Sequence, residues 1–454
     1  MSMSRQKCES QADLFVATTD LPRSPGHPFY DRLNKVLGAA GFDAFVEGLC
    51  EKFYAGEEGR PSIPPGVYMR MLLIGYFEGI DSERGIAWRC CDSMTLRSFL
   101  GYTLTQPTPE HSSLSRIRQR LDVETHEEVF TFVLKILSQE KLIRGKTIGV
   151  DATTLEANAA MKSIVRRDSG ESYDEFLERL AKSSGIETPT RSQLARIDRK
   201  RPKKGSNDDW RSPNDPDAQI TKMKDGRTHL AHKAEHAVDM DSGAVLAVTL
   251  QPAACGDTTS VYETMKATIE NLAELKSNEA GAEKPVADVT IEWVADKGYH
   301  SNDTVSTLEE LGMRGYISEP DRGRRRWRDK EAERDAVYAN RRRIKGRRGR
   351  RLMKLRGERI ERTFAHCLET GGLRRTHLRK HENIIKRYLV HVAAFNLGIL
   401  MRKLIGVGTP RGLQDRLEAC LDVLRDLRAL LGAGRRQIRS LFAPRVLSPT
   451  RCAA

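Results

Sequence analysis

The order of strand-like and helix-like segments after residue 147 restricts the fold more than any other feature of the chain. Residues 147–154 (TIGVDATT) alternate and are rich in β-branched side chains, which predicts a strand. Two further β-type runs flank Asp241-Ser242-Gly243 as in a hairpin. The expected elements that follow are a helix over 258–275, a strand over 289–296, a helix over 301–312, a strand over 314–319, and helices over 359–369 and 382–404. This order predicts an α/β fold, in which helices cover the faces of a mixed sheet.

Residues 27–140, ahead of this pattern, are expected to be entirely helical. Apolar side chains recur at helical spacing over 67–77, and Gly79 closes the run. A later helix is basic and projects Arg116, Arg118 and Arg120. A bundle of short helices with one basic helix is a shape that can enter a DNA groove, and a helical core with solvated arginines is the alternative.

The charge of the chain favours a polyanionic partner. Of its 454 residues, 30% are charged and 39% are hydrophobic, and the formal net charge is +14. Nucleic acid is the first candidate partner and an anionic membrane surface the second. The longest apolar run, near MLLIGYF, is about a third of the roughly 20 residues that a spanning helix needs, so we expect no membrane segment. The N-terminus has no signal-peptide pattern and the eight cysteines have no CxxC spacing, which together predict a cytoplasmic protein without a zinc or disulfide framework.

Two stretches interrupt the α/β pattern. Residues from about 156 to 226 are polar, and we expect an insertion with some helix and much irregular chain. Residues from about 320 to 356 include a dense run of arginines, which either contacts DNA phosphates, as we favour, or forms a solvated loop. Trp327, within this run, has the chemistry to stack on an unpaired base.

Two aspartates stand where strands are expected to end. Asp151 follows the apolar residues of the first strand, and Asp296 ends the later strand IEWVAD. Residues near strand ends of an α/β sheet can project into a shared crevice, and Glu361 can join them because Ile360 and Phe364 give its helix a buried face. Phosphodiester chemistry needs such a trio, since Mg²⁺ prefers carboxylate oxygens. With 62 acidic residues some trio can always be chosen, and a single aspartate at a strand end is usually a turn residue or a cap.

Four strings of residues carry a resemblance to a known family. They are GVDATTLEAN at 149–158, the run from DGRTHL to AVTL at 225–250, ADKGYHS at 295–301 and RIERTF at 359–364. They resemble insertion-sequence DDE transposases of the IS-five-like group, and the portion from HPFY to SSLSRIRQRL resembles the InsH-like N-terminal domain found there. The resemblance extends from about residue 27 to 402. It implies a ribonuclease-H-like catalytic sheet, which the order of elements allows, as it also allows several other α/β folds.

The resemblance implies a transposase that binds the terminal inverted repeats of an insertion sequence and catalyses metal-dependent DNA cleavage and strand transfer. Asp151, Asp296 and Glu361 match the family's catalytic, metal-binding carboxylates, which hold two Mg²⁺ ions per site, with Mn²⁺ as an alternative. The implied partners are double-stranded DNA, at the terminal repeats and at the target, and a second copy of the chain in the synaptic complex. The implied divisions are an N-terminal extension at 1–26, a helical DNA-binding domain at 27–140, a catalytic domain at 141–405 with the two insertions, and a helical, basic tail at 406–454.

The sequence departs from the family near the third carboxylate. Related transposases often have an arginine four residues before the glutamate and a lysine seven residues after it, where this chain has Gly357 and Leu368. Glu358 is therefore a rival to Glu361, although we favour Glu361. The arginines that would take over the phosphate contact are Arg356, Arg359 and Arg362.

Other polar residues near these strings have two interpretations each. Asp257 is either a secondary metal-site residue or, as we favour, a helix cap. Lys297 and Tyr299 either touch DNA phosphate or shape a turn. His300 either orients a water or, as we favour, is exposed to solvent. The histidines at 229, 232 and 236 would form a metal-binding face on a helix, but their segment reads as a strand, where only the last two share a face. A zinc role is therefore disfavoured.

Two further functional classes remain open. One is a catalytically silent DNA-binding protein derived from a transposase. The other is a non-catalytic RNA-binding or ribosome-associated protein, which the net charge alone would allow.

Overall fold

The computed structural model describes residues 26–55, 62–201, 205–223, 226–278, 290–323 and 325–413. Its centre is a mixed sheet in the order β4-β5-β1-β7-β8, with β6 also paired to β5. The strands are β1 (Thr147–Glu156), β4 (Gln219–Lys222), β5 (Thr228–Asp239), β6 (Val245–Pro252), β7 (Glu292–Ala295) and β8 (Arg314–Ile317). β1 runs antiparallel to β5 and parallel to β7, and β7 runs parallel to β8. The predicted mixed sheet and the hairpin of β5 and β6 are confirmed.

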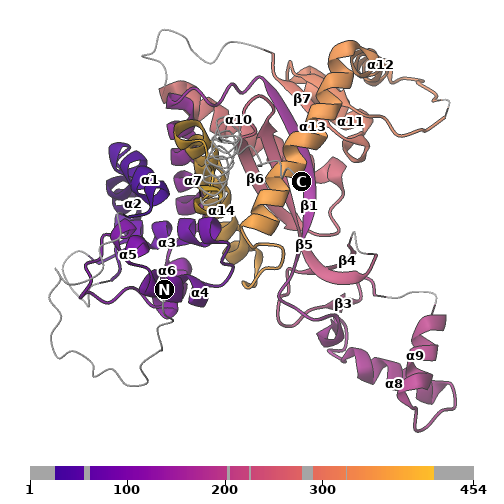
Figure 1. Ribbon diagram of the computed structural model, residues 1–454. Helices are drawn as coiled ribbons and strands as arrows, with labels where there is room; N and C mark the ends of the chain where they lie inside the picture. The colour runs from indigo at the N-terminus through magenta and orange to yellow at the C-terminus, as the bar shows by residue number, and fades with distance from the viewer. Residues whose placement is uncertain are drawn as a thin grey trace, which may run out of the picture.

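Helices cover both faces of this sheet (Figure 1). The helices of this part are α10 (Asp257–Asn278), α11 (Asn302–Glu310), α12 (Glu331–Lys345), α13 (Arg347–Ala365) and α14 (His381–Ile405). Neighbouring residues of a strand point to opposite faces. His236 of β5 contacts α13 and α14, whereas Glu235 beside it contacts α10. α13 and α14 therefore lie on one face and α10 on the other.

The described residues from 28 to 139 form helices. These are α1 (Pro28–Ala39), α2 (Phe42–Cys50), the short η1 (Glu51–Phe53), α3 (Pro65–Glu78), α4 (Glu83–Asp92), α5 (Met94–Phe99), α6 (His111–Arg120) and α7 (Val123–Gln139). α3 begins at Pro65, whose fixed backbone angle suits a first turn, and ends at Gly79 with φ of 69°. The helix expected over 67–77 is thus present with its predicted end.

One hydrophobic core joins these helices to the sheet. It includes Phe29 of α1, Leu134 of α7, Val150 of β1 and Tyr388 of α14, all fully buried or nearly so. α14 packs against α3, α7 and β6 at once. The core therefore continues across residue 140, where the sequence suggests a boundary between domains.

α14 is the central helix of this core. A helical stretch beginning at His381 is, among the described residues, long and apolar enough to cross a membrane by length and composition alone. Within it, 72% of the most apolar window is buried inside the protein. Its apolar surface is thus covered by neighbouring elements of the same chain, as in a core helix.

The first insertion has the expected helical part, in α8, and it also has a core of its own. It folds into a lobe with η2 (Met161–Ser163), β2 (Val165–Arg166), α8 (Tyr173–Ser183), α9 (Arg191–Lys200) and β3 (Trp210–Arg211), which projects from the sheet in Figure 1. Trp210 is 2% exposed and packs edge-on to Phe176 at 5.2 Å, at the centre of a separate small core. Capping boxes at Ser172 and Thr190 start the two helices. The segment is mostly polar, so its sequence does not predict a core, but a few aromatic and aliphatic side chains are enough to form one.

The structure of the arginine-rich segment contradicts one of its two interpretations, a solvated loop. Much of it is helical, in α12 and in the first half of α13, which begins twelve residues before the predicted start at 359. Leu352 of α13 is buried with Val294 and Tyr316 of the sheet. Arginine is a good helix former, so this segment is helical although few of its apolar side chains are buried.

The described residues include five of the eight cysteines and the first residues of the expected C-terminal tail. Five described cysteines are free thiols, at Cys50, Cys90, Cys91, Cys255 and Cys367. Residues 1–25, which form nearly all of the expected N-terminal extension, and 414–454, most of the expected tail, lie outside the described residues.

Candidate active site

The register between β1 and β7 determines where the two aspartates lie. The parallel pairing aligns Gly149 with Val294, after which β7 ends at Ala295. Two residues after this aligned pair come Asp151, within β1, and Asp296, directly after β7, so the two lie at the same level of the sheet. Residues far apart in the chain are thus brought together by the parallel register. β1 does not end at Asp151, contrary to the expectation from sequence, because its pairing with β5 continues to Glu156.

Asp296 lies in the tight turn that follows β7. Its carboxylate accepts a hydrogen bond from the Gly298 N–H at 2.8 Å and caps the short helix η3 (Lys297–Tyr299). A Cβ at Gly298 would lie 2.4 Å from Oδ2 of Asp257 and 3.1 Å from Oδ1 of Asp296. Glycine therefore allows both carboxylates to approach the same point of the backbone.

Glu361 comes from α13, which packs directly on the sheet. Ile360 is buried, and a Cβ at Gly149 of β1 would lie only 3.0 Å from Cδ1 of Ile360. This close approach of helix and strand brings Glu361 to the cavity that Asp151 lines. Glu358 does not line that cavity and lies 3.6 Å from Arg362 in an exposed ion pair.

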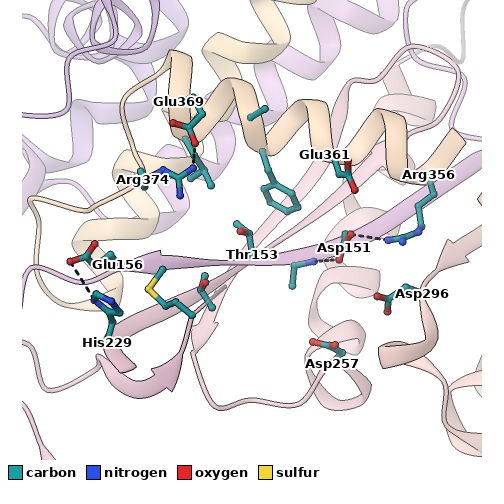
Figure 2. Close-up of a pocket in the computed structure, with 16 residues that line it drawn as sticks. Asp151, Thr153, Glu156, His229, Asp257, Asp296, Arg356, Glu361, Glu369 and Arg374 are labelled. Carbon is teal, nitrogen blue, oxygen red and sulfur yellow. Dashed lines mark hydrogen bonds and ion pairs between the residues drawn. The ribbon is translucent and has the colours of Figure 1, made fainter. Parts of the chain in front are cut away.

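The cavity has a volume of about 860 Å³ and follows β1 (Figure 2). One end is acidic and carries Asp151, Asp257, Asp296 and Glu361, with Arg356 among them. The other end carries Glu156, His229, Glu369 and Arg374, with Thr153 and Thr154 on the strand between. An elongated cleft of this kind suits a chain-like substrate better than a compact one.

Arg356 neutralises the central carboxylate. Its Nη1 donates to Oδ2 of Asp151 at 2.8 Å, and the Ala152 N–H donates to Oδ1 at 2.9 Å. Burial raises the pKa of Asp151 above its ordinary value and the charge of Asp296 adds to this effect, while Arg356 and the Ala152 N–H oppose it. The site therefore clusters negative charge, and the guanidinium of Arg356 neutralises part of it.

Lys233 neutralises a second carboxylate from beneath the cavity. Its ammonium lies 2.6 Å from Oδ1 of Asp257, and its side chain is only 6% exposed. Sequence reasoning missed Lys233 and its neighbour Glu235. The signal was available in HKAEH, where charged residues interrupt a strand that is otherwise apolar.

The donors of the acidic end suit a hard divalent cation. They are carboxylate oxygens, which Mg²⁺ and Mn²⁺ prefer. With the side chains in their present positions, the described residues form no group of three or more His, Cys, Asp or Glu side chains that could hold an ion. One oxygen of Asp151 and one of Asp257 are instead occupied by Arg356 and Lys233.

The residues expected to contact DNA fall into two sets. Arg116 and Arg120 of α6 and Lys297 after β7 are exposed, and Arg362 is half-exposed beside Glu358. Arg118 does not fit this role, because it is 7% exposed and donates to Glu83, Asn383 and Ser115 inside the helical core. Tyr299 does not fit it either.

Tyr299 is 1% exposed and its hydroxyl donates to Glu235 at 2.8 Å. It shapes the turn after Asp296, which was the other interpretation of this residue. Arg359 is half-buried near the turn at Gly243, and Arg356 is engaged by Asp151. The ring centroids of Trp327 and Tyr338 lie 6.3 Å apart, and the Arg325 guanidinium lies 5.4 Å from the centroid of the Trp327 ring.

The histidines take structural positions. His300 is fully buried, contrary to the favoured expectation of an exposed side chain, because the segment after β8 lies beside it, with Arg322 donating to its carbonyl at 2.8 Å. His232 pairs with Asp215 at 3.0 Å, and His236 contacts Thr363 and Tyr388. Their alternation along β5 is as predicted.

Two family models match the chain. One, described as a transposase domain (DUF772), matches residues 20–120, and the other, described as a transposase DDE domain, matches residues 165–397, just over half of the chain. The second match includes Asp257, Asp296 and Glu361, whereas Asp151 precedes its first residue. Searches of curated proteins and of solved structures find no match.

Proposed function

The chain belongs to the DDE transposases of insertion sequences, and from this premise we propose that it binds the terminal inverted repeats of an element of the IS-five-like group and cuts and rejoins DNA at the Asp151–Asp296–Glu361 end of the cavity. The sheet would then be the ribonuclease-H-like core of the catalytic part. The protein would act in the cytoplasm, where the donor and target DNA of a bacterial cell are found.

The meeting of β1 and β7 is the observation that carries this proposal. Their parallel register brings Asp151 level with Asp296, and α13 adds Glu361 to the same cavity. A protein that only binds DNA has no need of clustered carboxylates, because they repel phosphate. The acidic end in a chain of net charge +14 therefore favours an enzyme over a silent DNA-binding protein.

The three carboxylates would act as oxygen ligands for two Mg²⁺ ions, with Mn²⁺ as an alternative. Such ions, when bound, activate the attacking oxygen and stabilise the leaving oxygen of an in-line displacement. Arg356, once released from Asp151, would pair with a phosphate of the bound strand, and Lys297 would neutralise a neighbouring one. In the first step the oxygen of water forms a bond to phosphorus and the 3′-oxygen leaves. In the second, the oxygen of the freed 3′-hydroxyl forms a bond to a phosphorus of the target DNA, and the 3′-oxygen of the target strand leaves.

The exposed face of α6 supports DNA binding by the N-terminal helices. Arg116 and Arg120 border a cavity of about 620 Å³. Hydroxyl groups of Thr108, Ser112 and Ser113 line the same cavity. Guanidinium and hydroxyl groups together are typical contacts to the DNA backbone. Two ends must be brought together in transposition, so we propose that two copies of the chain assemble on them.

Substitution of the carboxylates tests the catalytic assignment. We expect Asp151→Asn, Asp296→Asn and Glu361→Gln each to lower Mg²⁺-dependent nicking of repeat-end DNA by on the order of 100-fold or more, since each removes a group that stabilises charge in the transition state. Binding of the same DNA, followed by gel shift, should change little. Glu358→Gln, on the same helix but outside the cavity, is the matched control.

Two outcomes would contradict this assignment. If Asp151→Asn or Asp296→Asn nicks at the wild-type rate, the pocket is not catalytic. If Glu358→Gln loses activity and Glu361→Gln keeps it, the third carboxylate is Glu358. A chain that binds structural RNA as tightly as repeat-end DNA, with no nicking, would instead be an RNA-binding protein.

A further inference from the structure

β5 places two charged side chains inside the protein, directly beneath the carboxylate cavity. Lys233 is 5% exposed and Glu235 is fully buried. The two residues are two positions apart on the strand, so both point to the face that α10 covers. Burial of a charge is costly unless it is paired and hydrogen-bonded, so the partners of these residues indicate what they hold in place.

The ammonium of Lys233 holds the start of α10. It donates to Oδ1 of Asp257 at 2.6 Å, to Oγ of Ser260 at 2.8 Å and to the Cys255 carbonyl at 3.2 Å. These three contacts use all three of its hydrogens. Asp257, which lines the acidic end of the cavity, is thereby fixed by a residue that lies outside it.

The carboxylate of Glu235 holds the turn that carries Asp296. It accepts hydrogen bonds from the Tyr299 hydroxyl at 2.8 Å, from Ser260 at 2.8 Å and from Thr264. Ser260 accepts from Lys233 and donates to Glu235, so it joins the two charged residues. Tyr299 follows Asp296 by three residues in the same turn.

The contacts form a continuous connection from one cavity carboxylate to another. It runs from Asp257 through Lys233, Ser260 and Glu235 to Tyr299 and the Asp296 turn. The two ends meet again at Gly298, next to which both carboxylates lie. Figure 2 shows Asp257 and Asp296 at the same end of the cavity, on the side away from Glu361.

We propose that Lys233 and Glu235 are positioning residues of the catalytic site, which set the separation of Asp257 and Asp296 and so make these two carboxylates competent to bind one divalent cation together. The inference rests on the proposed function. It extends that function by adding Asp257 to the cation-binding carboxylates and by assigning the buried network to their placement. A network that only stabilised the fold would leave cation affinity unchanged in any variant that still folds.

Binding of Mn²⁺ to the full-length protein without DNA tests the proposal. Free Mn²⁺ is measured by electron paramagnetic resonance, and folding by circular dichroism and thermal melting. We expect Tyr299→Phe, which removes a single hydroxyl, to weaken Mn²⁺ binding roughly 10-fold or more, as loss of a partner that orients a metal ligand commonly does. Lys233→Met should weaken it as well, and Lys233→Arg should retain more of the wild-type affinity because it keeps the charge.

Tyr262→Phe is the matched control. Tyr262 lies on α10, but its hydroxyl contacts Asp303 at 2.6 Å and lies outside the network and the cavity. Its substitution should leave the Mn²⁺ affinity unchanged. If Lys233→Met does not fold, Tyr299→Phe decides the question alone.

Wild-type Mn²⁺ affinity in folded Tyr299→Phe would overturn the proposal while leaving the proposed function intact. Failure of the proposed function has a different signature. In that case the wild-type protein binds no Mn²⁺, or binds it equally well after Asp151→Asn and Asp296→Asn are combined.

Discussion

Gly298 shows how far a single hydrogen atom determines the geometry of the site. Its Cα hydrogen occupies the place where a methyl group would meet Asp257 at 2.4 Å and Asp296 at 3.1 Å. Asp257 has little freedom to move aside, since Lys233 holds its other oxygen at 2.6 Å. Two carboxylates can therefore flank this turn only if it carries glycine.

At this position we expect Gly298→Ala to lower DNA nicking by on the order of 10- to 100-fold, because a displacement of about 1 Å at a catalytic group can cost that much. End binding and the circular dichroism spectrum should not change. Gly256→Ala is the control, since a Cβ there meets nothing within 4 Å although it adjoins Asp257. Equal rates for the two variants would show that the turn tolerates the methyl group.

The residue-level predictions that failed share one cause. A DNA contact by Arg118 or Tyr299 and an exposed position for His300 each require an accessible side chain, as polar side chains usually are. Each is buried instead, the first two with specific partners, Glu83 and Glu235. A sequence shows that a residue can form a hydrogen bond but not whether its partner comes from the protein or from a ligand.

Among the elements, α7 depends on a local cap that can be tested in isolation. Asp122 accepts a hydrogen bond from the Thr125 N–H at 2.8 Å and starts the helix. Burial alone would raise the pKa of Asp122, but hydrogen bonds from Thr125 and the charge of Lys52 hold it below its ordinary value. The cap therefore stabilises the protein most when its carboxylate is ionised.

We expect Asp122→Ala to reduce the free energy of unfolding by about 1 kcal/mol at neutral pH. Because the folded pKa lies below the unfolded one, this contribution is complete above the unfolded value and is lost as the pH falls through the folded value. The difference from wild type in chemical denaturation should thus shrink below about pH 4. A difference that stays constant from pH 7 to pH 3 would contradict the role of the charge.

The elements with clear hydrophobic periodicity were predicted well, and the polar ones were not. The strands around Asp151 and Asp296 and the helix that became α14 follow from their apolar patterns. The first half of α13 was missed because runs of arginine are compatible with a helix or a solvated loop. The contact of Leu352 with the sheet favours the helix, and a contact between distant parts of the chain is not visible in a local pattern.

At the scale of the whole molecule, α14 packs against both the N-terminal helices and the sheet. Arg387 of α14 is buried and donates to the carbonyls of Leu72, within α3, and Ile80, just after α3. On another side, Asn396 bonds to the backbone of Val245 in β6. The helices that we propose to bind DNA therefore share a core with the catalytic sheet.

Because the N-terminal helices share their core with α14 and the sheet, we expect that residues 1–143, expressed alone, do not fold cooperatively. The faces of α3 and α7 that pack on α14 in the intact protein would be exposed to water. Dispersion of amide signals in an NMR spectrum and the shape of the thermal melt measure this. A well-dispersed spectrum with a sharp melt would show instead that the helices form an independent domain.

At this scale the sequence predicted the class of fold but not the site. Strand order alone allowed several α/β folds, and the level of Asp151 relative to Asp296 depends on a parallel register that nothing in either strand specifies locally. The resemblance to transposases predicts that Asp151 and Asp296 belong together, and the parallel register of β1 and β7 explains why they lie close.

Arg356 and Lys233 have a consequence for how the protein matures. Each acts as a built-in counterion for a carboxylate that would otherwise repel its neighbours. The acidic end of the cleft can consequently assemble while the polypeptide folds, without waiting for dissolved cations to screen it. Maturation and loading would then be separate events: on loading, Arg356 would leave Asp151 for a phosphate of the DNA, while Lys233 would keep Asp257 in position.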